Sequence, residues 1–134
     1  MDVCPRTAAR IYLIVMKLTL ENLPPTLQDN VEAISACLEA FDRVMPLHAV
    51  YLFGSHARGD ARADSDVDLC IVSDGAERQL EAAERLRHAM WDIWPRPPFT
   101  LIPISPKRLA EKKNCRDHFF STVLREGVQL ASEN

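Results

Sequence analysis

The sequence predicts an α/β (α+β) domain in which a small mixed β-sheet is flanked by helices. Three observations carry this prediction: short apolar runs with strand character, longer segments with helical spacing, and the alternation of the two along the chain. The 134 residues suit a single core, and 47% apolar with 26% charged residues is typical of folded proteins. We divide the chain into an N-terminal segment, residues 1–22, and a domain of residues 23–134.

The N-terminal segment contains an apolar run, residues 11–16 (IYLIVM), that is too short to span a bilayer. No small-residue cleavage site follows it, so we expect no targeting signal and no membrane contact. Met16 opens MKLTLENLPP, which resembles a natural protein start. Residues 1–15 are therefore either an added edge strand or the result of an over-long start assignment. Four scattered cysteines without a C-x-x-C pair favour free thiols and a cytoplasmic location.

The first long helix is predicted between Thr26 and Pro46. Thr26 can cap it, with Asp29 at the capping-box position, and Pro46 stops it. Its apolar residues recur at helical spacing: Val31, Ile34, Cys37, Leu38, Phe41 and Met45. The next apolar run, residues 49–53 (AVYLF), predicts a buried strand that leads into Gly54.

Residues 67–72 predict a second strand, and a turn at residues 73–75 follows it. An amphipathic helix is then predicted over residues 76–94, with its charges on a solvated face. The apolar positions at helical spacing in this segment are Leu80, Ala83, Leu86, Met90 and Ile93.

The last two elements follow the breaker at residues 95–98. Residues 99–104 (FTLIPI) predict a third strand, which Pro103 places at a sheet edge or ends early. Residues 107–127 predict a helix that ends at Gly127, with a buried face formed by Phe119, Phe120, Val123 and Leu124.

The chemistry of the sequence is concentrated at the first two strands. Asp66 and Asp68 are two apart at a strand start, so their side chains point to the same face. Two carboxylates held this close repel each other unless a cation lies between them, and oxygen ligands suit Mg²⁺. Upstream, a strand ends in Gly54 and Ser55, a turn that can present N–H groups and a hydroxyl to phosphate. Arg58 can add positive charge.

Each of these features is weak alone, because most Gly-Ser turns only reverse the chain and most Asp-x-Asp pairs are solvated. An anion cradle and a cation site on adjacent strands together favour metal-assisted phosphoryl or nucleotidyl transfer. Asp60 and Asp64 are interpreted as solvated loop residues. The four histidines show no ligand spacing and are interpreted as structural or solvated: His48, His56, His88 and His118.

The pattern G-S-x-A-R-G, six residues, and D-x-D-L resembles the signature of the minimal nucleotidyltransferases of the DNA polymerase beta-like superfamily. The matching residues are Gly54, Ser55, Ala57, Arg58, Gly59, Ser65, Asp66, Asp68 and Leu69. The resemblance implies a nucleotidyltransferase-like fold that uses ATP and Mg²⁺. It also implies that Gly54 and Ser55 hold the β and γ phosphates, with Arg58 and Ser65 beside the nucleotide. Asp66 and Asp68 would be the catalytic metal ligands.

The family reaction moves a nucleoside monophosphate onto a hydroxyl and releases pyrophosphate. Free-standing members of this size resemble antitoxins that pair with HEPN-domain ribonuclease toxins, and some of these adenylylate a tyrosine of the toxin. We therefore expect a HEPN-domain partner in a hetero-oligomer, with a homodimer as the other possible assembly. No direct nucleic-acid contact is expected from a net charge of −3.

The sequence departs from the family pattern at Thr100, where the resemblance places a third aspartate. Threonine carries no charge and cannot act as a base near neutral pH, so turnover is in question. Three hypotheses follow: an adenylyltransferase acting on its partner, a degenerate antitoxin that acts by binding alone, and a small-molecule transferase of the aminoglycoside-modifying kind. The nucleotide preference and the acceptor residue stay open. Trp91 and Trp94 either anchor a partner or close the core beside Phe99.

Overall fold

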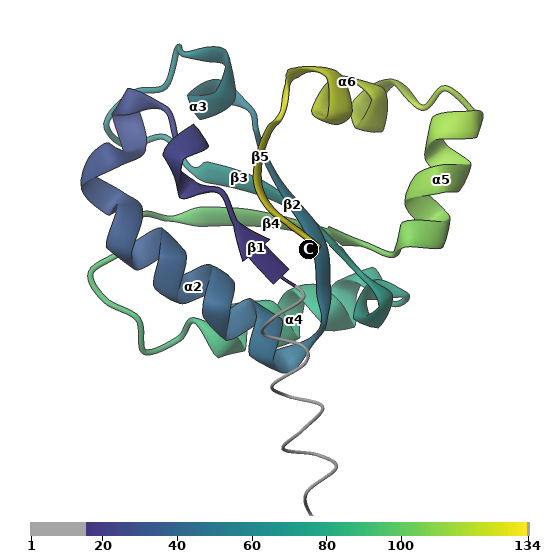
Figure 1. The fold of residues 1–134 in the computed structure, drawn as a ribbon, viewed down its shortest axis with the longest axis horizontal. Helices are drawn as coiled ribbons and strands as arrows, with labels where there is room; N and C mark the ends of the chain where they lie inside the picture. Colours follow the sequence, from purple (N-terminus) through teal and green to yellow (C-terminus); the bar gives the residue numbers. More distant parts are fainter. Residues whose placement is uncertain (1–15, 134) are drawn as a thin grey trace, which may run out of the picture.

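The computed structural model describes residues 16–133, which are built around a five-stranded mixed sheet with helices on both faces (Figure 1). The strand order is β1-β5-β2-β3-β4. Neighbouring strands are antiparallel except β3 and β4, which run parallel. The strands are β1 (Met16–Leu18), β2 (Leu47–Phe53), β3 (Val67–Ser73), β4 (Phe99–Ile104) and β5 (Val128–Glu133). This architecture confirms the predicted fold class.

Helices connect the strands and cover both faces of the sheet. Figure 1 shows α2 and α4 on one side, and α5 and α6 on the other. The α-helices are α2 (Val31–Val44), α3 (Ser55–Arg58), α4 (Gln79–Ala89), α5 (Pro106–Asn114) and α6 (His118–Glu126). Single turns of 3₁₀-helix are η1 (Leu20–Asn22) and η3 (Asp74–Ala76), and a longer one is η2 (Pro25–Asn30).

The larger core lies between the sheet and the helices α2 and α4. The apolar face of α2 packs on alternate residues of the central strands, because side chains on a strand point to the two faces in turn. Leu52 of β2, Leu69 of β3 and Leu86 of α4 are fully buried there. Four residues of α2 that helical spacing predicts to be buried are buried: Ile34, Cys37, Leu38 and Phe41. Ala40 and Asp42 are buried as well, and Val31 is only partly buried.

A smaller core lies on the opposite face, beneath α6. It contains Ala49, Cys70, Val72, Ile104, Phe120 and Val123. Cys70 and Val72 belong to β3, and the side chain of Asp68, two residues before Cys70, points to the same face of that strand. The face that carries Asp68 is therefore the one that packs against α6, on the opposite side from α2.

The predicted third strand is confirmed as β4, an edge strand of the sheet. Pro103 is tolerated there because an edge strand leaves one side without ladder hydrogen bonds. The prediction for Leu80 is wrong, since this side chain is 87% exposed. The helix begins at Gln79, and its buried face is formed by Ala82, Ala83 and Leu86, which turns Leu80 away from the core.

The single helix predicted over residues 107–127 is two helices. The helix is interrupted between α5 and α6, where Arg116 has a left-handed φ of 56°. Asp117 then caps α6, accepting a hydrogen bond from the Phe120 N–H at 3.0 Å. The strand β5, which follows Gly127, was not predicted.

Thr26 does not cap the first long helix, contrary to prediction. It lies inside η2, and α2 starts only after Asn30, whose side chain makes no capping bond. Pro25 is tolerated as the first residue of η2 because the N–H that it lacks would have no acceptor within a helix.

The strand β1 adds to the sheet by antiparallel pairing with β5, with Met16 opposite Glu133 and Leu18 opposite Ala131. The two alternatives for residues 1–15 lie outside the described residues. Within residues 16–133, no helix combines the length and apolar character needed to cross a membrane.

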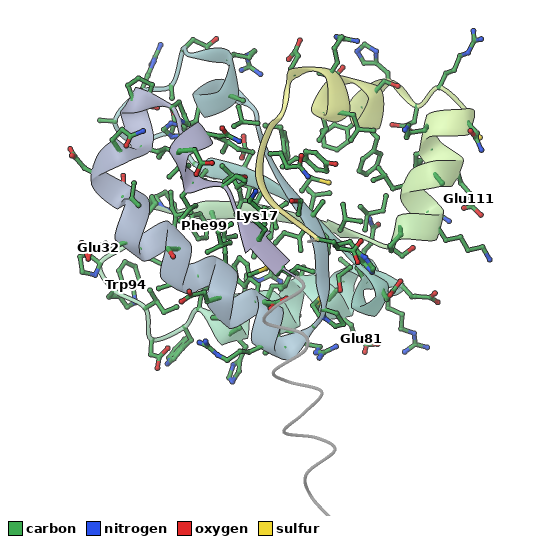
Figure 2. All side chains as sticks on the ribbon, in the orientation of Figure 1. Lys17, Glu32, Glu81, Trp94, Phe99 and Glu111 are labelled. Atoms are coloured by element: carbon green, nitrogen blue, oxygen red, sulfur yellow. The ribbon has the colours of Figure 1, made fainter. Side chains whose placement is uncertain are left out.

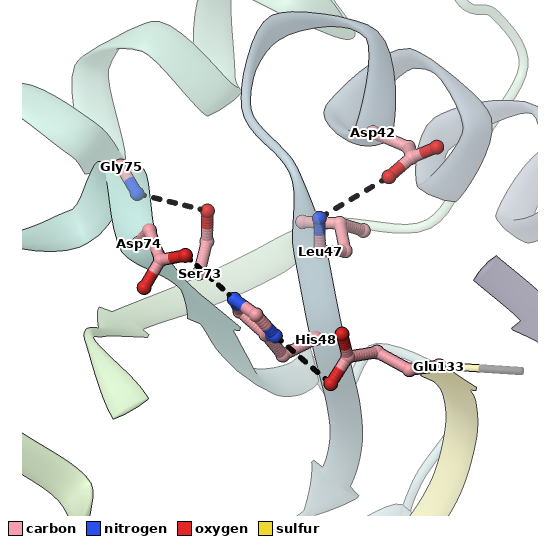
Figure 3. Close-up of polar contacts among 7 residues, drawn as sticks. All are labelled: Asp42, Leu47, His48, Ser73, Asp74, Gly75 and Glu133. Carbon is pink, nitrogen blue, oxygen red and sulfur yellow. Dashed lines mark hydrogen bonds and ion pairs between the residues drawn. The ribbon is translucent and has the colours of Figure 1, made fainter. Parts of the chain in front are cut away.

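A polar cluster lies at the start of β2, at the opposite end of that strand from Gly54. Figure 3 shows its residues. His48 is held between two carboxylates, with Nε2 at 2.9 Å from Asp74 and Nδ1 at 3.0 Å from Glu133. Burial acts to lower the pKa of His48, but the two carboxylates outweigh it and raise the pKa overall. Asp42 is fully buried nearby and accepts a hydrogen bond from the Leu47 N–H at 3.2 Å. These contacts join the start of β2 to its neighbours.

Candidate active site

The candidate site begins where β2 ends, at Gly54. This residue has φ 79° and ψ −154°, a region that residues with a side chain rarely adopt. A Cβ added to Gly54 would lie 2.0 Å from Oδ2 of Asp68. The glycine therefore both makes the turn and gives the carboxylate of Asp68 room to approach the chain.

The short helix α3 follows directly on this turn. It is closed by a hydrogen bond of 3.0 Å from the Arg58 N–H to the Gly54 carbonyl and ends at Gly59, whose φ is 88°. The first N–H groups of a helix have no acceptor within it, so those at Ser55 and the next two residues remain as donors. Together with the Ser55 hydroxyl they form a set of donors that suits a phosphate group.

Asp66 and Asp68 lie at the start of β3. Asp68 pairs in register with Phe53 of β2 on one side and with Thr100 of β4 on the other. The Thr100 hydroxyl donates a hydrogen bond of 3.0 Å to Oδ2 of Asp66. Two carboxylates and one hydroxyl thus form one group, the Asp66–Asp68–Thr100 cluster, which adjoins Gly54.

The environment of Asp68 disfavours its ionised form. Burial raises the pKa of this carboxyl, and the nearby charge of Asp66 adds to the increase. The nearby Thr100 hydroxyl and the charges of His56 and Arg58 act in the opposite direction without cancelling it. A cation bound between the carboxylates would relieve this repulsion.

The donor set of the cluster fits Mg²⁺. Its protein ligands are all oxygens, which a hard cation prefers, and Mg²⁺ is commonly held by one or two carboxylates plus phosphates and water. Among the described residues, no three His, Cys, Asp or Glu side chains gather into a complete metal site. The protein part of the site is therefore incomplete by itself, and a phosphate-bearing ligand can supply the remaining oxygens.

The other predicted site residues lie in the loop that joins α3 to β3 or beside it. Arg58 is half-exposed and lies 3.5 Å from Asp60, near enough to Asp68 to influence its pKa. Ser65 accepts a hydrogen bond of 2.8 Å from the Arg62 N–H, so its hydroxyl holds a turn of the loop. The structure brings Gly54, Asp66 and Asp68 together, and it places Ser55 and Arg58 at the two ends of α3 beside them.

A contact that sequence reasoning missed holds this loop in place. His56 is buried, with Nε2 donating to the Ser65 carbonyl at 3.4 Å and Nδ1 hydrogen-bonded to the Thr26 hydroxyl at 2.9 Å. Nε2 is the donor in the first contact because a carbonyl oxygen can only accept. His56 thereby ties α3, η2 and the residue before Asp66 together. No local pattern signals this, because Thr26 and His56 are 30 residues apart.

Trp91 and Trp94 do not close the core. They are 74% and 69% exposed, which removes the alternative of burial beside Phe99. Arg96 lies over the Trp94 ring, 4.7 Å from its centroid. Figure 2 shows Trp94 near Glu32, and the two residues line a surface pocket of about 610 Å³. Both tryptophans are accessible to a partner.

The fold and the site together define an α/β domain in which a glycine turn and two carboxylates suit a metal-bound phosphate compound. A profile of the nucleotidyltransferase domain matches residues 34–124, which include both the turn and the Asp66–Asp68–Thr100 cluster. The chain belongs to this family. The resemblance to nucleotidyltransferases is thus confirmed at the level of the family.

The chain is also similar to two solved structures, the first of which shares its fold. One, from Sulfolobus solfataricus, is described as a "putative nucleotidyltransferase"; it has a TM-score of 0.50 and 21% identity, with 78% of this chain and 81% of that chain covered. Another, described as a "putative minimal nucleotidyltransferase", has a TM-score of 0.40 and 26% identity, covering 75% of this chain and 87% of that one. No curated protein sequence matches the chain significantly.

Proposed function

We propose that this protein transfers AMP from ATP, with Mg²⁺, to a hydroxyl group of a partner protein. The observation that supports the proposal most directly is the approach of Asp68 to the Gly54 turn. It brings the proposed cation ligands next to the proposed phosphate donors, and nucleotidyl transfer requires these two functions side by side. A bound Mg²⁺ would neutralise charge on the phosphates and help to orient them.

The chain's own residues have distinct tasks in this scheme. The donors at the start of α3 hold the phosphates, Asp66 and Asp68 are the cation ligands, and Arg58 adds positive charge. The acceptor oxygen forms a bond to the α-phosphorus, the bond from that phosphorus to the bridging oxygen breaks, and pyrophosphate leaves. Thr100 cannot take the acceptor's proton near neutral pH, so this proton passes to water and we expect slow transfer.

We further propose that the partner is a HEPN-domain ribonuclease toxin and that the acceptor is a tyrosine. The family resemblance supports this choice. Exposed Trp91 and Trp94 support a protein partner in general, since tryptophan is enriched among the residues that dominate binding energy at interfaces. The protein would then act as an antitoxin in a hetero-oligomer.

The test is transfer of label from α-³²P-ATP to a HEPN-domain protein encoded by an adjacent gene, in Mg²⁺ and in Mn²⁺. Label on a tyrosine is expected with the wild type and not with Asp66→Ala or Asp68→Ala. Asp64→Ala is the matched control, because Asp64 is an exposed acid of the same loop and should leave transfer unchanged. Absence of label with folded wild type and its bound partner would refute the proposal.

Inhibition by binding alone is the second candidate, and the neutral side chain of Thr100 favours it. In that case the folded double variant Asp66→Ala, Asp68→Ala should still inhibit the toxin's ribonuclease activity. Loss of inhibition with complex formation intact would favour transfer instead.

A further inference from the structure

The strongest unexplained feature of the site is the neutral member of the Asp66–Asp68–Thr100 cluster. Thr100 lies opposite Asp68 in the parallel pairing of β3 and β4, yet its hydroxyl donates to Asp66. A hydroxyl has one proton to donate, and here Oδ2 of Asp66 receives it at 3.0 Å. The contact engages one oxygen of Asp66, and no other hydrogen bond within the described residues restrains this carboxylate.

The same contact limits what the cluster can hold. Two divalent cations in one site lie about 3.5–4 Å apart and need negative ligands between and around them. The cluster has two carboxylates and, on the β4 side, only a hydroxyl whose proton points at Asp66. Among the described residues no third acid, His or Cys joins the pair. A cation brought in by the phosphates can use both carboxylates, but a second cation on the β4 side has no charged ligand of its own.

We propose that Thr100 is a positioning residue that orients Asp66, and that the site accordingly takes one divalent cation for each nucleotide. The inference rests on the proposed function, because the nucleotide is expected to deliver that cation. It goes beyond that function by assigning a task to Thr100 and a stoichiometry to the site.

The stoichiometry is measured with Mn²⁺ and α,β-methylene-ATP, which cannot transfer its nucleotide. Electron paramagnetic resonance distinguishes a single Mn²⁺ from two cations close enough to couple. The wild type should show one uncoupled cation in the complex with protein and nucleotide. Thr100→Asp supplies a third carboxylate and should show a coupled pair of cations. Thr100→Asn introduces a side chain of the same size as aspartate but without its charge, and should retain one cation.

The positioning role is measured as the affinity for Mn²⁺ with the analogue, by isothermal titration calorimetry. Thr100→Val keeps the shape and removes the hydrogen bond, so affinity should fall about threefold to tenfold. Thr100→Ser keeps the hydroxyl and should stay within about twofold of the wild type. Circular dichroism establishes that each variant is folded. If Thr100→Asp does not fold, the wild-type spectrum still decides the stoichiometry, and the Val and Ser variants decide the positioning role.

Three results would overturn the inference: a coupled pair in the wild type, one cation in folded Thr100→Asp, or equal affinity in the wild type and Thr100→Val. Transfer of label by a wild type that binds two cations would refute only this inference. Failure of the wild type to bind the Mn²⁺–analogue complex would refute the proposed function together with it.

Discussion

Replacement of Gly54 by alanine tests whether the turn and the carboxylate depend on each other. The added methyl group would have to coexist with Oδ2 of Asp68 at 2.0 Å and Cγ at 3.0 Å, so the carboxylate must move. The backbone at φ 79° and ψ −154° is itself strained for alanine, at a cost of about 1–3 kcal/mol. We expect Gly54→Ala to lower the free energy of unfolding by at least that amount. We also expect Mn²⁺–nucleotide binding to fall more than tenfold, roughly the loss of one well-placed charged ligand.

Gly59→Ala is the matched control at the other end of α3. Gly59 also has a positive φ, 88°, but an added Cβ would meet no atom within 4 Å. This variant should therefore lose only the cost of the left-handed backbone, about 1 kcal/mol, and keep its affinity for the Mn²⁺–analogue complex. Urea denaturation and isothermal titration measure the two quantities on the same preparations.

A double-mutant cycle isolates the clash from the backbone strain. In the background of Asp68→Ala the methyl group at position 54 meets no carboxylate, so Gly54→Ala should cost less there than in the wild type, by about 1 kcal/mol or more. Equal costs in the two backgrounds, or wild-type Mn²⁺ binding by Gly54→Ala, would refute the argument that this glycine makes room for Asp68.

Three further predictions concern the rest of the molecule. His56→Ala should weaken Mn²⁺–analogue binding by about threefold or more, and His56→Gln, which keeps a donor and an acceptor, should retain most of it in the same titration. Leu86→Ala should lower the free energy of unfolding by about 2–5 kcal/mol, whereas exposed Leu80→Ala on the same helix should change it by less than about 0.5 kcal/mol in urea. Because the pKa of His48 is raised in the folded state, its ion pairs stabilise the protein below its ordinary pKa and are lost as the pH rises through the raised value. Unfolding free energy should thus fall by about 0.5 kcal/mol between about pH 6 and pH 8; an identical profile for His48→Gln would contradict this.

The elements that the sequence predicts best are those whose buried residues follow a regular spacing within the element itself. The spacing on α2 identifies its buried face, and FTLIPI identifies β4 to the residue. The strand β5 escapes prediction because VQLASE has little strand character of its own, and its place between β1 and β2 comes from long-range pairing. The break at Arg116 escapes because no glycine or proline separates the two helices, although Asp117 is of a type preferred at the start of a helix.

The ligands of the candidate site are readable in the sequence, but the contacts that place them are not. The candidate phosphate and cation ligands lie within fifteen residues of one another: Gly54, Ser55, Asp66 and Asp68. Residues of these types indicate phosphate and cation binding. The room that Gly54 gives to Asp68 depends on the register of β2 against β3. The hydrogen bond between Thr26 and His56 depends on how η2 packs against α3, which no spacing rule supplies.

The candidate site has the residues expected for binding a nucleotide, but it lacks the acid expected to assist transfer. In the proposed function, the glycine turn, the helix donors and the two carboxylates all serve to bind the nucleotide and its cation. The one departure, Thr100, lies on the β4 side of the carboxylates, where the resemblance places the third acid that would serve the acceptor. Interactions that stabilise substrate and transition state equally strengthen binding without raising the rate of the chemical step. A protein built this way should therefore bind its nucleotide well and turn it over slowly, and Thr100→Asp should raise the rate of transfer far more than it changes the affinity for nucleotide.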